Sequence, residues 1–82
     1  MDNALRVAKD NNIAAMRAHV RASNALQAAE LTDNRARLYS DVWARRLHTR
    51  IELAAAMAAE RAAMAEWDAA MAVQAALVRG DQ

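Results

Sequence analysis

The sequence predicts an all-α protein, an antiparallel helical hairpin with a short first helix and a long, heptad-patterned, alanine-rich second helix. Alanine, the best helix former, accounts for 24 of the 82 residues. The chain has no proline and a single glycine, at position 80, so it lacks the turn residues that a strand-based fold usually needs. We expect one α-helical domain over residues 1–82, completed by oligomerisation or by a partner.

The first helix is expected over residues 3–30, followed by a turn at 31–33. Thr32 and Asp33 belong to a cluster of turn-favouring residues, and either side chain can accept hydrogen bonds from the free N–H groups of a following helix. Within the first helix, alanine recurs at every seventh position, at Ala8, Ala15, Ala22 and Ala29. Such a strip lets two helix backbones approach closely, so it predicts the face that packs against the second helix.

The second helix is expected over residues 34–79, with Gly80 as its C-terminal stop. The motif Ala-Ala-Met-Ala occurs three times at a spacing of seven residues, starting at positions 55, 62 and 69. A seven-residue repeat indicates helices that pack along a shared seam, and we place the methionines on that seam. Thr49 to Glu52 matches a capping box, which leaves an alternative: a break near residue 48 and a self-contained three-helix bundle.

The two predicted helices differ in length, about 42 Å against about 69 Å. With a turn near residue 32, the first helix ends opposite residue 61 or so, and the late part of the second helix projects beyond it. Exposed apolar patches mark interaction sites, and methionine and tryptophan suit them. The expected interface residues are Met57, Met64, Trp67, Met71, Val73, Leu77 and Val78.

A second candidate surface is basic. Arg17 with Arg21, and Arg46 with Arg50, are like-charged pairs four residues apart, which is mildly destabilising unless an anion is near. The predicted turn would bring all four to one level of the hairpin, where they could contact phosphate groups of a nucleic acid. The net charge of only +1 argues against a DNA binder driven by electrostatics.

The sequence gives little support for catalysis or metal binding. It has no cysteine, and neither of its two histidines, His19 and His48, has enough ligands at helical spacing to complete a metal site. A two-helix hairpin offers little concavity for excluding water from a reaction. We therefore expect no enzyme activity, no cofactor, no metal and no small-molecule substrate.

A membrane location is not expected either. The chain begins without a basic segment followed by an apolar run, as a secretion signal would have, and its most apolar stretch, 51–78, contains five charged residues. The polar face of that stretch is acidic, whereas helices that lie on membranes usually carry Lys or Arg there. We expect the protein in the cytoplasm, or within a virus particle assembled there.

These observations predict a non-enzymatic structural or assembly protein that packs through its second helix, in a homo-oligomer or a larger particle. The abundance of alanine and arginine suggests GC-rich coding, and hence a bacteriophage or bacterial assembly component, such as a virion component. One alternative is a small nucleic-acid-associated accessory protein that uses the arginine cluster. Another is an inhibitor or adaptor that binds the surface of a different protein.

Overall fold

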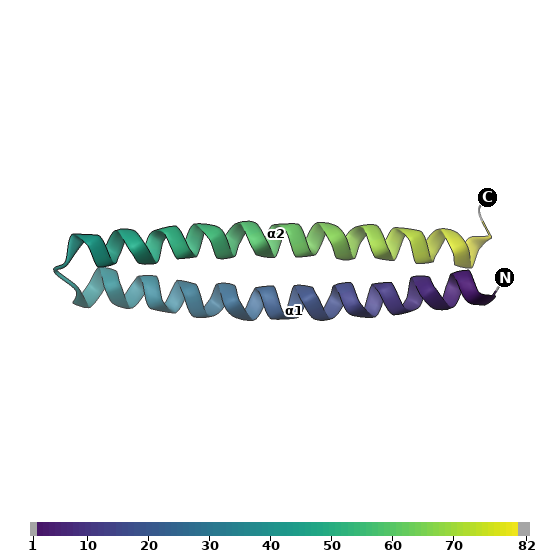
Figure 1. The fold of residues 1–82 in the computed structure, drawn as a ribbon, viewed down its shortest axis with the longest axis horizontal. Helices are drawn as coiled ribbons and strands as arrows, with labels where there is room; N and C mark the ends of the chain where they lie inside the picture. Colours follow the sequence, from purple (N-terminus) through teal and green to yellow (C-terminus); the bar gives the residue numbers. More distant parts are fainter. Residues whose placement is uncertain (1, 81–82) are drawn as a thin grey trace.

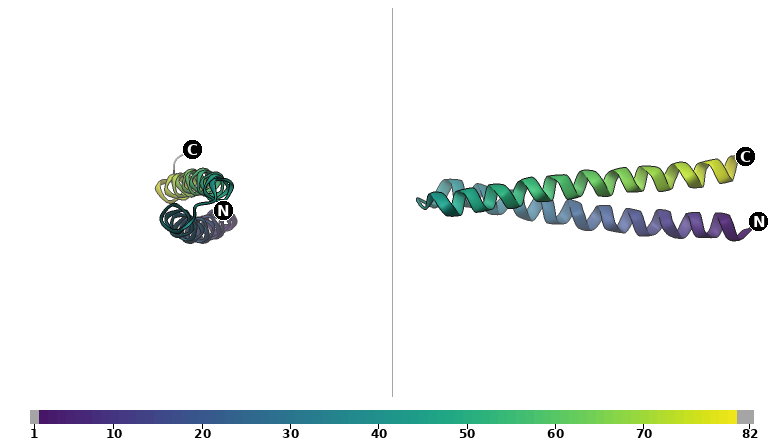
Figure 2. Two further views of the ribbon diagram at one scale, coloured as in Figure 1. Left: turned by 90° about the vertical axis from the view of Figure 1, so that its left-hand side faces the viewer. Right: turned by 45° about the horizontal axis from the view of Figure 1, so that its top comes forward.

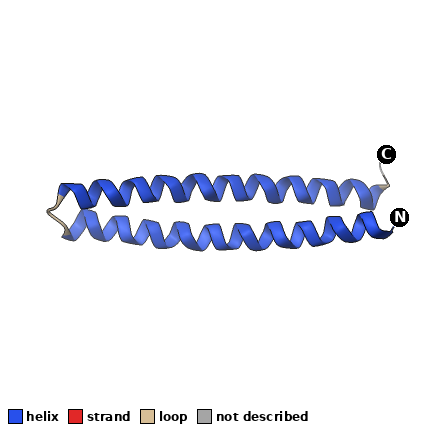
Figure 3. Cartoon of the chain, viewed as in Figure 1, coloured by secondary structure: helices blue, strands red, loops and turns tan. Residues whose placement is uncertain are grey.

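The computed structural model describes residues 2–80, which form two antiparallel helices joined by a short loop (Figures 1 and 3). Helix α1 spans Asp2–Tyr39 and helix α2 spans Trp43–Arg79, with residues 40–42 between them. The loop lies at one end of the molecule, and the start of α1 and the end of α2 lie together at the other. The predicted all-α hairpin is therefore confirmed.

The described chain forms a thin rod that measures 60 × 16 × 13 Å. Its length matches the roughly 57 Å that the 38 residues of α1 span at 1.5 Å per residue. Viewed along the rod, the two helices lie side by side with no third layer of described chain on either side (Figure 2). The hairpin thus has two open faces along its whole length.

The turn lies nine residues later than the sequence predicts, so the expected helix bounds of 3–30 and 34–79 are wrong. Thr32 does not cap a new helix; its hydroxyl donates to the carbonyl of Ala28 at 3.0 Å, within α1. Ser40 takes the turning role instead. Its backbone N–H closes α1 on the carbonyl of Ala36, and its hydroxyl accepts from the N–H of Val42, at 3.2 Å.

The later turn makes the two helices almost equal in length, 38 and 37 residues. The predicted overhang is therefore absent, because α1 accompanies α2 along its length (Figure 1). Helix α2 also runs without a break through residue 48. Thr49 is not an N-cap but a buried position inside the helix. The alternative of a three-helix bundle is thereby excluded for the described residues.

The contact between the helices, called the seam below, follows a strict seven-residue repeat. Along α1 and into the first residue of the loop, its buried and half-buried residues recur at alternating intervals of three and four: Leu5, Ala8, Asn12, Ala15, His19, Ala22, Leu26, Ala29, Asp33, Ala36 and Ser40. In α2 the corresponding line is Thr49, Leu53, Ala56, Glu60, Ala63, Trp67, Ala70 and Gln74. Apart from Thr49, alanine thus fills every second position of the seam, which is the sign of two helices packed at close range.

The predicted alanine strip of α1 does lie in the seam, but the methionines of α2 do not. The seam runs through Ala56, Ala63 and Ala70, and the three methionines follow one position later, on its flank. The physical reason is the fit between the helices. Because α1 presents alanines, α2 approaches most closely when it presents alanines too, and a methionine at those positions would hold the backbones apart.

This close packing leaves the hairpin with a very small core. Ala8 and Ala36 are the only buried apolar side chains in the described chain, and no large side chain is fully buried. At the far end of α2, Gly80 has φ 75° and ends the helix in the left-handed conformation. Its role as the C-terminal stop is as predicted, because a residue with a side chain is strained there.

Candidate interaction surfaces

Tryptophan 67 lies inside the hairpin rather than beyond it. Its indole Nε1–H donates to Oδ1 of Asn12 at 2.8 Å, and the amide of Asn12 donates in turn to Oε1 of Gln74 at 2.6 Å. The ring also lies against His19, with centroids 5.4 Å apart. His19 Nε2 is 2.8 Å from Oε1 of Glu60. These polar residues of both helices fix the register of the seam, and they give Trp67 an intramolecular role.

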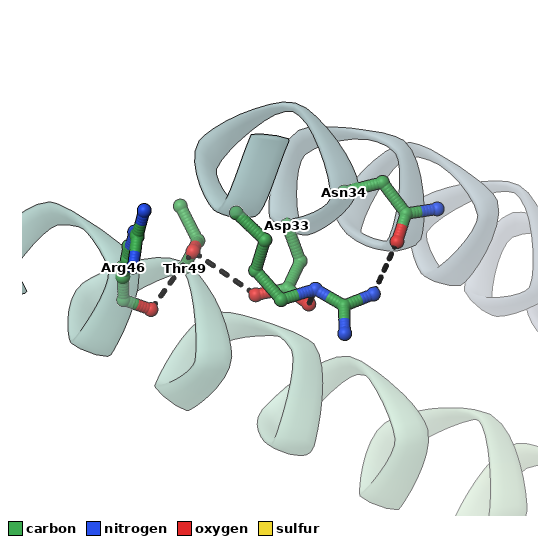
Figure 4. A network of polar contacts seen from close by, with 5 residues as sticks. Asp33, Asn34, Arg46 and Thr49 are labelled. Carbon is green, nitrogen blue, oxygen red and sulfur yellow. Dashed lines mark hydrogen bonds and ion pairs between the residues drawn. The ribbon is translucent and has the colours of Figure 1, made fainter. Parts of the chain in front are cut away.

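A second polar contact fixes the register near the loop (Figure 4). The carboxylate of Asp33, whose side chain is only 4% exposed, accepts from the hydroxyl of Thr49 at 3.1 Å and pairs with Arg37 at 3.3 Å. The same hydroxyl lies 3.0 Å from the backbone carbonyl of Arg46, so its one hydrogen is shared between the two acceptors. A buried carboxylate needs such partners because water cannot solvate it. Asp33 therefore serves as a bridge between the helices and not as a cap.

This bridge gives a testable prediction. Replacing Thr49 by valine keeps the shape of the side chain but removes one of the donors to the buried carboxylate of Asp33. We expect a loss of about 1–2 kcal/mol in the free energy of unfolding, measured by chemical denaturation. Thr32→Val is the matched control, because its hydroxyl is exposed and bonds only within its own helix. An equal effect of the two substitutions would contradict the role assigned to Asp33 and Thr49.

One open side of the rod is apolar. Methionine follows a seam alanine by one position in both helices, so the methionines lie along the same side of an antiparallel pair. Two pockets share Asn12 and Gln74 on this side; Met16 lines one and Met71 the other. We call this surface the methionine face. Its six central side chains are 36–50% exposed: Ile13, Met16, Val20, Met57, Met64 and Met71.

The remaining predicted interface residues lie around this face. Val78 lines the pocket that contains Met71, at the end of the rod where α1 begins and α2 ends. Leu77 continues the seam and is 38% exposed. Val73 follows Ala70 by three positions and lies on the opposite flank of the seam. The structure thus gathers the methionines and Val78 on one side and separates Val73 from them.

The predicted cluster of four arginines does not form. His19 contacts Glu60, so Arg17 and Arg21 lie at the level of residue 60 or so. Arg46 lies at the loop, where its Nε–H donates to the carbonyl of Ser40 at 2.7 Å. The midpoints of the two pairs are therefore separated by about 12 residues along α2, or about 18 Å. The cause is the shifted turn, which moves every pairing between the helices.

The structure gathers other arginines at the loop end. Five lie within residues 35–50, on the last turn of α1 and the first turns of α2: Arg35, Arg37, Arg45, Arg46 and Arg50. Two aromatic residues lie among them, Tyr39 at 84% exposure and Trp43 at 73%. We call this end the basic tip. Residues 35–50 carry net +4, and sequence reasoning placed all of them along the second helix, so it missed this convergence.

Other features of the described residues add no site. His48 Nε2 lies 2.9 Å from Oε1 of Glu52, but both side chains are exposed and belong to one helix turn. No group of three His, Asp or Glu side chains in the described chain could hold a metal ion. Neither described helix combines the length and apolarity needed to cross a bilayer. No family model matches this chain, and comparisons with curated proteins and with solved structures give no match either.

Proposed function

We propose that this chain is a non-enzymatic assembly protein, a helical hairpin that becomes a stable subunit when its methionine face packs against a second copy. The observation that carries the proposal is the missing core, since the only buried apolar side chains in residues 2–80 are two alanines. Burial of apolar surface is the main favourable term in folding, and two alanines supply very little of it. The hairpin therefore needs a partner surface that covers its exposed apolar side chains.

The exposed surface area of the chain is large enough for an interface with a second copy. The chain exposes 6231 Å², whereas a compact protein of 9.0 kDa exposes about 4,900 Å². The excess is about 1,300 Å², and a standard stable interface buries about 800 Å² on each partner. A methionine-rich surface can also adapt to a copy of itself. The product would be a four-helix bundle with the methionines in its centre.

Charge favours an antiparallel arrangement of the two rods. The basic tip carries net +4 over residues 35–50, so a parallel pair would place two such tips side by side. Residues 51–82 carry net −3. An antiparallel pair brings each tip toward the more acidic end of its partner, around a twofold axis near the middle of the methionine face. A larger particle could be built from such dimers.

Light scattering of the purified chain tests the proposal. We expect twice the mass of the 9.0 kDa chain, and we expect helicity measured by circular dichroism to fall together with the mass on dilution. The reason is that the hairpin alone has too small a core to persist. A folded monomer at all concentrations would overturn self-assembly and leave the adaptor or inhibitor as the second candidate.

The orientation is tested with one cysteine, because the natural chain has none. Asp41→Cys places a thiol in the loop at the basic tip. In an antiparallel pair the two loops lie at opposite ends, far beyond the roughly 7 Å that a disulfide can bridge. We expect no cross-linked dimer on oxidation. Rapid, complete cross-linking of the variant would show a parallel pair instead.

A further inference from the structure

The basic tip has more positive charge than its own residues balance. Arg37 is paired with Asp33, and Arg46 bonds to the carbonyl of Ser40 through its Nε. Arg35, Arg45 and Arg50 make no ion pair within the described part of the chain. The only other carboxylate between residues 34 and 51 is that of Asp41, in the loop. Three unpaired guanidinium groups at one end of a thin rod form a local field that attracts anions.

Like the unpaired arginines, the aromatic residues of the tip take no part in the packing of the hairpin. Tyr39 and Trp43 are 84% and 73% exposed, although large aromatic rings are usually at least half covered. Each ring lines an open pocket together with arginines, one on either side of the rod. Trp43 shares its pocket with Arg37, Arg46 and Arg50. Tyr39 shares the other with Arg35 and Arg45.

We propose that the basic tip binds single-stranded nucleic acid. Guanidinium groups bind phosphates, and exposed rings stack on unpaired bases; proteins that bind single strands without sequence preference combine these two contacts. The strand would cross the loop end from one pocket to the other, with phosphates on Arg45 and Arg50 and bases on Trp43 and Tyr39. A duplex offers no free base faces for the two rings, so single strands are favoured.

The alternative occupant of an aromatic, basic tip is an anionic membrane. The composition of the loop argues against it. Asp41 is exposed in the three-residue loop, between the two aromatic residues, so inserting the rings into a bilayer would carry its carboxylate toward the lipid interior. Burial of a charge at that depth is costly. A strand of nucleic acid instead contacts the pockets on the two sides of the tip, and as it crosses the loop end it does not carry Asp41 out of water.

The tip is separate from the methionine face, so this inference does not depend on self-assembly. Met57 follows Trp43 by 14 residues of helix, or about 21 Å, and it follows Arg50, the nearest residue of the tip, by seven residues, or about 10 Å. Trp43→Ala removes none of the charge that favours the antiparallel pair, so it should leave the mass of the protein in solution unchanged. Failure of the nucleic-acid test and failure of the dimer test can thus be told apart by light scattering on the same samples.

Fluorescence anisotropy with a labelled twelve-residue oligothymidine tests the proposal. Three to five phosphate contacts predict a weakening of about 20- to 130-fold when salt rises from 50 to 200 mM. Trp43→Ala should weaken binding about 5- to 150-fold, the loss of one stacked base. Arg45→Gln with Arg50→Gln should weaken binding and flatten the salt dependence, because two phosphate contacts are removed.

The matched control is Arg17→Gln with Arg21→Gln, which removes the same charge about 12 Å or more along the rod from Arg50, the nearest arginine of the tip, and should weaken binding less than the tip variant does. Four results would overturn the proposal. They are no binding of the oligothymidine at 50 mM salt, equal losses in the control and the tip variants, tighter binding of a duplex of the same length, and binding of phosphatidylserine vesicles without binding of the oligonucleotide.

Discussion

Replacing Trp67 by alanine should destroy the hairpin. The ring is the largest side chain in the seam, and it joins Asn12 by a hydrogen bond of 2.8 Å and His19 by ring contact. Truncation of a packed tryptophan costs about 3–5 kcal/mol, and the low end applies here because the residue is half-buried. That loss is comparable to the whole stability of a small domain. We expect circular dichroism at 25 °C to show a largely unfolded chain.

Two companion variants separate the causes. Trp67→Phe keeps a ring in the seam but removes the donor to Asn12, so it should lose about 1 kcal/mol and remain folded. Trp43→Ala removes the other tryptophan, which is 73% exposed, and should change the free energy of unfolding by less than about 0.5 kcal/mol. If Trp43→Ala destabilised the chain as much as Trp67→Ala, the assignment of the seam would be wrong.

The fold class could be predicted because it depends on composition and periodicity, which are local. Abundant alanine without proline predicts helix, and a seven-residue repeat predicts a long helix-to-helix contact. The position of the turn could not be predicted in the same way. Asp33 carries the same carboxylate whether it caps a helix or bridges two helices, and only the distant Thr49 decides between these roles.

The seam of α2 shows a similar limit. Residues 56 and 57, and their equivalents seven and fourteen positions later, form two neighbouring lines, one of alanine and one of methionine. Burial of apolar area favours the methionines, whereas close approach to the alanines of α1 favours the alanines. The repeat alone gives the spacing of the seam residues, but it does not show which of the two lines forms the seam. The choice depends on the partner helix, and it leaves the methionines on an open side.

Both candidate surfaces differ from the predicted ones for a single reason, the position of the turn. The shift of the turn from residues 31–33 to 40–42 brings Trp67 into the seam and separates the two predicted arginine pairs. It also places Tyr39 and Trp43 on either side of the loop, among five arginines. The residues that sequence analysis selected were of the right types. Predicting which of them lie together requires the register between the two helices, and long-range polar contacts set that register.

Replacing Met57 and Met64 together by glutamate should abolish self-assembly. Both side chains are partly exposed in the single hairpin, at 45% and 38%, so the substitution creates no buried charge within one chain. In the proposed dimer the same positions lie in the centre, where four carboxylates of two copies would meet without partners. Burying them costs several kcal/mol in total, so association should weaken by at least a thousandfold.

The matched control is Val7→Glu with Val73→Glu. It introduces the same charge at side chains that are 48% and 55% exposed and that lie on the other side of the seam. We expect the control to keep the mass of a dimer in light scattering, and the methionine variant to show the mass of one chain at the same concentration. Because the free hairpin has so small a core, the methionine variant should also lose helicity at low concentration, and added salt should not restore it. If both variants stayed dimeric, the two copies would meet elsewhere; if both dissociated, acidic charge alone would disperse them, and the methionine face would have no special role.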